Sequence, residues 1–524
     1  MNIKEAKQEI VNTLHAYLKK DEEGNYTYPL VHQRPLFLIG APGIGKTAIM
    51  EQVAKEENIG LVSYTMTHHT RQSAVGLPKI VSRVYGGVTM DVTEYTMSEI
   101  IAAVYAQMET TGKKEGILFL DEINCVSETL APAMLQFLQN KTFGGHKVPE
   151  GWLIVAAGNP SGYNKSVREF DIVTLDRVRK MEIQPDLDVW MEYAWKQGIH
   201  GAVLSYLNIH KESFYYIKNS REEKSFVTAR GWEDLSRILK SYEDLGIQVT
   251  EDLIWQFLQE KEIGRDFASY YQIYRKYGTD YGIPQILDGS LSQQIEEEKL
   301  AMARNGSAED RLTVTGLFLQ DLNERLICVD TGKQRLSLLY DKLCILKNSI
   351  NQGNSIKHTS SVKPDENGIS QIDGWLGQHI KEQKKSLAVR KKAGLLSMEE
   401  ALPERQAIEC MERYDLDLRK LHITGREEQF EKIKVFFQEE QLRTERLCTH
   451  TGQALIRAFA FMEKAFGDGA EMMLFVTRLT GNPRASAFIA EHGCAPYFKY
   501  SDKLLPGKRQ EQLQQACRQA LESR

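Results

Sequence analysis

Hydrophobic residues in the first third of the chain occur in short runs that alternate with amphipathic segments. Five runs have the length and composition typical of buried strands, and they cover residues 36–40, 61–67, 116–122, 151–159 and 178–184. Alternation of this kind indicates a parallel sheet covered by helices. We therefore expect an α/β domain at residues 30–185, preceded by an amphipathic N-terminal helix within residues 1–29.

After Pro185 the pattern changes to helical periodicity with many aromatic residues. We expect an α-helical lid domain at residues 186–300, a helical extension at 301–347 and a helical C-terminal accessory domain at 371–524. Residues 348–370 are polar and aperiodic and contain Gly and Pro, which predicts a linker. Two apolar stripes of the C-terminal part predict core faces, and their members are Leu455, Phe459, Met462 and Phe466, then Met472, Phe475, Val476 and Leu479.

Composition and charge narrow the class of protein. A chain of 524 residues is too long for one hydrophobic core. The net charge of -5 makes nucleic acid a poor default partner. The seven cysteines form no CxxC pair, so neither a disulfide framework nor a zinc site is expected. No run of about eighteen apolar residues occurs, and the N-terminus does not resemble a signal peptide, so we expect a cytoplasmic protein without a membrane span.

A phosphate-binding loop follows the first predicted strand. Residues 40–47 read GAPGIGKT and fit the pattern GxxxxGK[ST] between a strand and an apolar helix. Its backbone N–H groups would surround phosphate oxygens, its lysine would neutralise them, and its threonine would offer a hydroxyl to Mg²⁺. The residues expected to bind ATP are Gly40, Ala41, Pro42, Gly43, Ile44, Gly45, Lys46, Thr47 and Ala48.

A second motif ends the apolar run GILFLDE with two carboxylates, Asp121 and Glu122. Unpaired charge at the end of a buried strand is costly, and a bound Mg²⁺ would compensate it. We expect Asp121 and Thr47 to hold Mg²⁺ and Glu122 to activate the water that attacks the γ-phosphate. Taken alone, two such carboxylates are more often a charge pair at a helix N-terminus; the loop at residues 40–47 favours the catalytic interpretation.

These motifs, in this order, resemble an AAA+ ATPase of the MoxR-like branch over roughly residues 30–240. The resemblance implies that Asn159 contacts the γ-phosphate or the attacking water. It implies that Arg177, within TLDRVRK, is an arginine finger completing the site of a neighbouring subunit, with Arg168 and Arg179 as alternatives. It also implies that Arg230, within TARGWEDL, reaches the same nucleotide from the lid.

Two stretches, residues 67–90 and 139–152, resemble the insertions of MoxR-like proteins, and the second reads as a hairpin around Gly144 and Gly145. The resemblance implies a homo-oligomeric ring, expected to be a hexamer, which remodels a protein client with a chaperone-like activity. It also suggests a partner with a von Willebrand factor type A domain. The alternatives are a DNA-directed AAA+ motor and an ATP-dependent assembly switch with little turnover. Residues 300–524 carry no readable chemical motif and are interpreted as an accessory for client or partner binding.

Overall fold

The computed structural model describes residues 1–504 apart from residues 144, 162, 164–166, 168–169, 220–223, 352–374, 393–397 and 424. The chain forms two compact units. The first comprises Met1–Ala194 and Tyr206–Tyr271, and the second comprises Trp195–Ser205 and Gln272–Arg524. The finer division into domains expected from the sequence stays a prediction.

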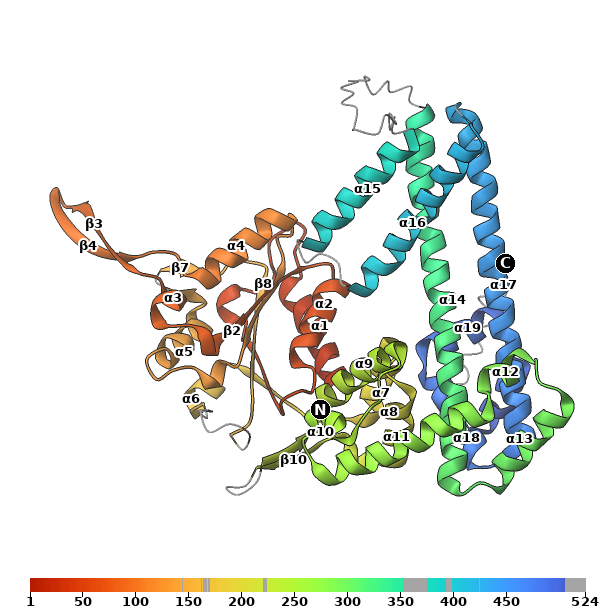
Figure 1. Cartoon of the computed structure of the whole chain (residues 1–524). Coiled ribbons are helices and arrows are strands. Elements are labelled where there is room, and N and C mark those ends of the chain that lie inside the picture. Colours follow the sequence, from red (N-terminus) through yellow and green to blue (C-terminus); the bar gives the residue numbers. More distant parts are fainter. Residues whose placement is uncertain are drawn as a thin grey trace. The chain divides into compact units, whose positions relative to one another are not determined.

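A five-stranded parallel sheet is the centre of the first unit, with the strand order β2-β5-β8-β1-β9 (Figure 1). The strands are β1 (Leu36–Gly40), β2 (Gly60–Thr65), β5 (Gly116–Asp121), β8 (Trp152–Gly158) and β9 (Arg179–Ile183). Each coincides with one of the five apolar runs, so the expected α/β fold with a parallel sheet is confirmed. Their carboxyl ends meet at one edge, where ligands bind in open α/β sheets.

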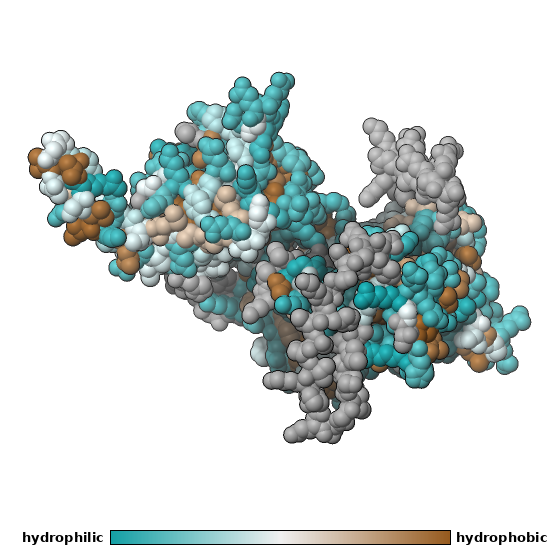
Figure 2. Space-filling view, turned by 90° about the horizontal axis from the view of Figure 1, so that it is seen from above, coloured by the Kyte–Doolittle hydropathy of each residue, from teal (hydrophilic) through white to brown (hydrophobic). Residues whose placement is uncertain are grey.

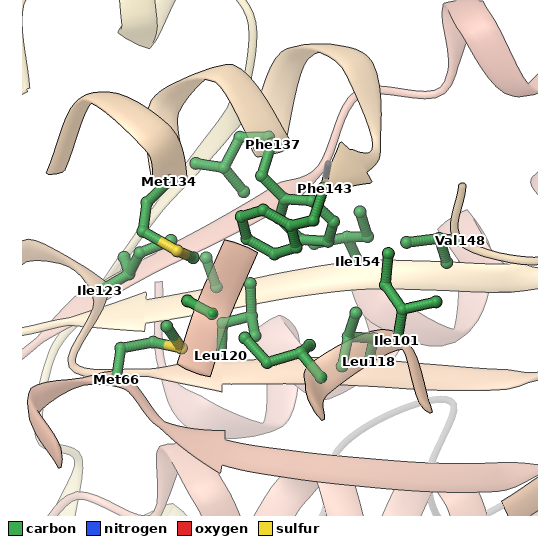
Figure 3. Close-up of a cluster of buried hydrophobic side chains, with 14 of the residues drawn as sticks. Met66, Ile101, Leu118, Leu120, Ile123, Met134, Phe137, Phe143, Val148 and Ile154 are labelled. Atoms are coloured by element: carbon green, nitrogen blue, oxygen red, sulfur yellow. The ribbon is translucent and has the colours of Figure 1, made fainter. Parts of the chain in front are cut away.

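Helices cover both faces of this sheet. Successive strand residues point to opposite sides, so each face has its own set of apolar side chains. On one face the core includes Leu36, Leu38 and Ile117, which pack with helices α1 (Ile3–Leu18) and α2 (Lys46–Glu56). On the other face Leu118 and Leu120 pack with α4 (Glu99–Thr111) and α5 (Ala131–Asn140). Figure 3 shows this second core, in which the rings of Phe137 and Phe143 stack at 4.0 Å.

Two insertions leave the sheet domain as hairpins. The first contains α3 (Arg71–Val75), β3 (Pro78–Tyr85) and β4 (Val88–Tyr95), and its antiparallel strands project from the domain (Figure 1). The second pairs β6 (Thr142–Phe143) with β7 (His146–Lys147), which confirms the expected hairpin. Figure 2 shows hydrophobic residues on the projecting first hairpin, at the left of the view.

Residues 206–271 belong to the same compact unit as the sheet. The helices that follow the sheet are α7 (Leu187–Gln197), α8 (Gly201–Ile209), α9 (Ala229–Leu245), α10 (Glu251–Phe257) and α11 (Lys261–Tyr281). Tyr206, Trp232 and Phe267 form an aromatic core here, with ring centroids 5.2 to 5.7 Å apart.

The lid region also contains an antiparallel hairpin that the sequence did not predict, β10 (Tyr216–Asn219) with β11 (Lys224–Val227). The hydrophobic pattern of β11 does not reveal this strand. Ser225 is buried, with 7% exposure, whereas its neighbour Phe226 is 37% exposed. The alternation of apolar and polar residues that marks a half-buried strand is therefore inverted at this point.

From residue 272 onward, the described residues of the second unit form helices and their connections. This agrees with the expected helical C-terminal region. Its helices are α12 (Ile283–Asp288), α13 (Gln293–Asn305), α14 (Ala308–Asn351), α15 (Trp375–Lys392), α16 (Met398–Lys420), α17 (Arg426–Phe466), α18 (Ala470–Gly481), α19 (Pro483–His492) and α20 (Ala495–Leu504). Helix α14 includes residues 348–351 of the expected linker, because the first glycine of that segment comes only at position 353. Residues 352–370 of the linker lie outside the described residues. Among the residues that are described, no helix is both long and apolar enough to cross a membrane.

The two apolar stripes of the C-terminal part lie in α17 and α18 and are core faces. Leu455, Phe459 and Met462 are at most 3% exposed, and Gly467 caps the end of α17. The stripe of α18 is buried as well, and Phe475 meets Phe459 edge to face at 5.1 Å. A separate core lies near the C-terminal end of α14, where Leu339 and Leu343 pack with α15, α16 and the start of α17.

Candidate functional site: a nucleotide site at the carboxyl edge of the sheet

The phosphate-binding loop lies between β1 and α2, and its backbone conformation requires glycine. Gly43 and Gly45 have φ angles of 75° and 95°, a region that side chains with a Cβ rarely adopt. Gly45 is the N-cap of α2, so the loop leads directly into the first helical residue, Lys46. The free N–H groups of the first helical turn therefore face the loop, which is the arrangement that binds phosphate.

Lys46 is turned inward. Its Nζ donates to the backbone oxygens of Gly40 and Ala41 at 2.7 and 2.9 Å and to Asn159 Oδ1 at 3.1 Å. These three acceptors match the three donors of an ammonium group. Burial lowers the pKa of Lys46 to about 8, and the nearby positive charge of Arg230 adds to this, whereas Asp121 and Glu122 oppose it.

Thr47 and Asp121 come together from α2 and the end of β5. Thr47 Oγ1 donates a hydrogen bond of 2.9 Å to Asp121 Oδ2. A hydroxyl and a carboxylate are the oxygen ligands that Mg²⁺ prefers, so this pair fits the metal expected from the motifs. The second oxygen, Asp121 Oδ1, accepts from the backbone N–H of Glu122 at 2.9 Å, which fixes the carboxylate.

Glu122 occupies the turn that follows β5. Its φ of 56° places it in the left-handed region, which is uncommon for a residue with a side chain and is found at functional turns. Its Oε2 accepts a hydrogen bond of 3.0 Å from Thr67 Oγ1. Thr67 belongs to a short 3-10 turn, Met66–His68, between β2 and the first insertion. The sequence gives no signal for this contact, because the two residues are 55 positions apart.

Asn159 follows β8, and its side chain faces the loop. Its Oδ1 accepts from Lys46, and its backbone oxygen accepts from Asn124 Nδ2 at 2.7 Å. Gly40, Ala41, Asn124 and Asn159 help to line a cavity of about 470 Å³ at this edge. A volume of this size is within the range of small-molecule sites.

The lid reaches the loop through residues near the start of α9. Thr228 is the N-cap of this helix, and its Oγ1 accepts from Gly231 N at 3.2 Å. A Cβ added to Gly43 would lie 3.1 Å from Thr228 Oγ1 and 3.5 Å from Arg230 Cβ, so both residues pack on the loop. Tyr215, which the sequence analysis missed, donates from its hydroxyl to Pro42 O at 2.8 Å.

The three candidate arginine fingers differ in their surroundings. Arg168 lies outside the described residues. Arg179 is held within its own chain: Nη1 donates to Thr13 Oγ1 at 2.8 Å, and Nη2 forms an ion pair with Glu9 of α1. Arg177 is exposed and follows the short helix α6 (Ile172–Leu175).

Comparison with known proteins places a family domain on this region. Residues 35–178 match the family model described as an AAA domain of the dynein-related subfamily. No curated protein matched the chain. The MoxR-like assignment therefore stays a prediction. The matched residues run from just before β1 to just before β9. Together with the five-stranded parallel sheet they support an AAA+ type ATPase domain in this chain.

Proposed function

We propose that this protein is a MoxR-like AAA+ ATPase that converts ATP and water to ADP and phosphate with Mg²⁺ and works as a homo-oligomeric ring on a protein client. One observation carries the ATPase assignment. Side chains from two strand ends and one helix start, namely Lys46, Thr47, Asp121, Glu122 and Asn159, converge at a single edge of the sheet. The cofactors are ATP and Mg²⁺.

The residues of the site divide the chemistry among them. The backbone N–H groups of the loop and the ammonium of Lys46 bind the β- and γ-phosphates, and Lys46 exchanges part of its present contacts for phosphate oxygens. Thr47 and Asp121 would hold Mg²⁺, which neutralises charge that develops on the phosphates. Glu122 orients the attacking water and accepts its proton. Asn159 donates from its amide, and Arg230 brings positive charge from the lid.

We infer that the site is completed by Arg177 of a neighbouring subunit. The exposure of Arg177 and the internal pairing of Arg179 with Glu9 support this choice. An arginine supplied in trans can contribute about 10³-fold or more to phosphoryl transfer. A ring places each finger beside the next site, and we expect a hexamer.

The projecting hairpin β3–β4 supports a protein client. Its most exposed apolar side chains include Ile80 at 73%, Val84 at 68% and Val88 at 56%. Within the hairpin, Arg83 forms an ion pair with Glu94, and Asp91 accepts a hydrogen bond of 2.7 Å from Ser82 Oγ. An exposed apolar surface of this kind suits a polypeptide better than a nucleic acid.

The hairpin is connected to the nucleotide site. Thr67, which hydrogen bonds Glu122, lies in the turn directly before α3 and β3. The second insertion contacts the base of the first, because His146 Nε2 lies 3.1 Å from Tyr95 O. A change at Glu122 during hydrolysis therefore has a short route to the hairpin. A DNA-directed AAA+ motor and an ATP-dependent assembly switch are the alternative functions. For the leading function, we propose a partner protein with a von Willebrand factor type A domain.

ATP turnover tests the core of this proposal. We expect Lys46→Ala to abolish binding of ATP because it removes the phosphate contact, and Glu122→Gln to retain binding while turnover falls by about 10² or more. Calorimetry measures the first, and phosphate release measures the second. An exposed substitution, Glu51→Gln on α2, serves as the control. Unchanged ATP affinity in Lys46→Ala would remove the phosphate assignment.

A further inference from the structure

We infer that Asn124 is a positioning residue for ATP hydrolysis. Its side chain ties the turn that carries Glu122 to the backbone of Asn159. This role rests on the ATPase activity proposed above. No motif singles out Asn124, yet its side chain joins two segments that both supply groups to the site. It lies in the 3-10 turn Ile123–Cys125, immediately after Glu122.

The backbone around Asn124 is held firmly. Its neighbours Ile123 and Val126 are 1% and 5% exposed and belong to the hydrophobic core on the α4 and α5 face. The backbone N–H of Cys125 donates to Glu122 O at 2.9 Å and closes the turn. Since Glu122 and Asn124 share this tight turn, a shift of one is a shift of the other.

The side chain of Asn124 is buried, with 5% exposure, and a buried amide must be hydrogen bonded to avoid a penalty. Its partner, Asn159 O, is an acceptor, so the atom at 2.7 Å must be the donor Nδ2. The amide lies directly over Gly158, where an added Cβ would come within 2.4 Å of Asn124 Oδ1. The absence of a side chain at position 158 makes room for this contact.

Asn159 is thereby held at two points. Lys46 is a donor and must face Oδ1 of Asn159, so the amide nitrogen is the group left to point toward the phosphate and the attacking water. Asn124 fixes the backbone of the same residue. Without this second point, Asn159 and the Glu122 turn are free to move apart. A displacement of about 1 Å in such a site can cost about 10²-fold in rate.

Steady-state kinetics of Asn124→Leu test this role in the full chain. We expect kcat to fall by about tenfold or more, because the catalytic groups are no longer aligned. The Kd for a non-hydrolysable ATP analogue should change by less than about threefold, since the phosphate loop itself is intact. Asn140→Leu, at an exposed residue at the end of α5, is the matched control and should retain the kcat of the unmodified protein.

A double-mutant cycle separates positioning from a general loss of structure. If Asn124 and Asn159 act on the same alignment, then Asn124→Leu combined with Asn159→Ala should lower kcat by clearly less than the product of the two single effects. Multiplied effects would overturn the role. Should Asn124→Leu fail to fold, the isosteric Asn124→Asp decides in its place: it replaces the donor by an acceptor, and an unchanged kcat would overturn the role.

The two proposals fail in different ways. If the unmodified protein does not hydrolyse ATP, the proposed function is wrong. If the unmodified protein hydrolyses ATP and both Asn124 variants keep its kcat, only the positioning role is wrong.

Discussion

Lys46 is the residue on which the nucleotide site is centred, and its ammonium is already fully hydrogen bonded within the chain. Its pKa of about 8 is below the ordinary lysine value of about 10.4 because the charged form is desolvated. At neutral pH it carries its proton, but between these two values the folded protein binds this proton less tightly than the unfolded chain does. Stability attributable to Lys46 therefore rises with pH in this window.

This pKa predicts that nucleotide binding takes up a proton. Phosphate charge should raise the pKa of Lys46 again, so at pH 8 binding of ATP takes up about half a proton per site, and at pH 6.5 almost none. Calorimetry in two buffers of different ionisation enthalpy measures this uptake. In Lys46→Arg the side chain is always charged, so the uptake should vanish. Lys141 shares a pKa of about 8 but hydrogen bonds Leu30 O instead, and should not respond.

Part of this site could be predicted at the scale of residues. Lys46, Thr47 and Asp121 belong to patterns whose spacing along the chain reflects a local geometry, and the structure brings them together. Thr67 and Asn124 carry no such signal. Their partners are 55 and 35 positions away, and the contacts depend on how neighbouring strands are aligned. The hydrogen bond between Arg179 and Thr13 likewise depends on the position of α1 beside β9.

At the scale of elements, buried strands were predictable and half-exposed strands were not. The strands of the sheet are covered on both faces, so each is a continuous apolar run. The β10–β11 hairpin has a buried serine beside an exposed phenylalanine, and the sequence pattern missed it. Helical periodicity identified the core faces of α17 and α18 but could not show that α14 extends over 44 residues.

A cluster of three charged side chains joins helices α14, α15 and α16. Glu404 of α16 accepts from Lys342 of α14 at 2.9 Å and from Arg390 of α15 at 2.5 Å. Lys342 and Glu404 are 7% and 8% exposed. Burial alone would raise the pKa of Glu404, but these two cations outweigh it and lower the pKa. The carboxylate thus stays ionised inside the bundle.

Removing one member of this group should be costly. We expect Glu404→Gln to lower the free energy of unfolding of this region by about 3 kcal/mol, because it leaves the Lys342 charge buried without compensation. Glu412→Gln breaks an exposed pair with Lys384 and should cost at most about 1 kcal/mol. Hydrogen exchange of the amides in α14 and α16 measures both. Equal effects of the two substitutions would contradict the assignment.

The β3–β4 hairpin makes a separate prediction about client contact. Serine at Val84, Val88 and Met90 removes apolar side chains that are at least 51% exposed, so folding should be little affected. We expect basal ATP turnover to stay within about twofold, while stimulation by a reduced and carboxymethylated unfolded polypeptide is lost. Serine at Leu245 and Ile247, which are exposed on the lid, is the matched control. Stimulation that survives in the hairpin variant would contradict a client role for this surface.

At the scale of the whole molecule, the proposed ring requires one chain to complete the site of another. Arg177→Ala should remove about 10³-fold of turnover, and Lys46→Ala should remove binding, so neither variant works alone. Mixed in equal amounts, they form sites in which intact Lys46 of one chain meets intact Arg177 of the next. Phosphate release should return to about a quarter of the unmodified activity, the fraction of productive interfaces under random assembly.

Two controls accompany this mixing experiment. Lys46→Ala mixed with the double variant Lys46→Ala/Arg177→Ala should remain inactive. Arg179→Ala should retain turnover within about threefold, since that side chain binds Glu9 and Thr13 of its own chain. If activity does not return when Arg177→Ala and Lys46→Ala are mixed, Arg177 does not act in trans.

The contact between Gly158 and Asn124 has an evolutionary consequence. A methyl group at position 158 would collide with the Asn124 amide, so alanine there forces the amide away from Asn159 O. Related sequences should then accept alanine at position 158 only together with a smaller residue at position 124. Positions 124 and 158 should therefore change together among related sequences that share this site.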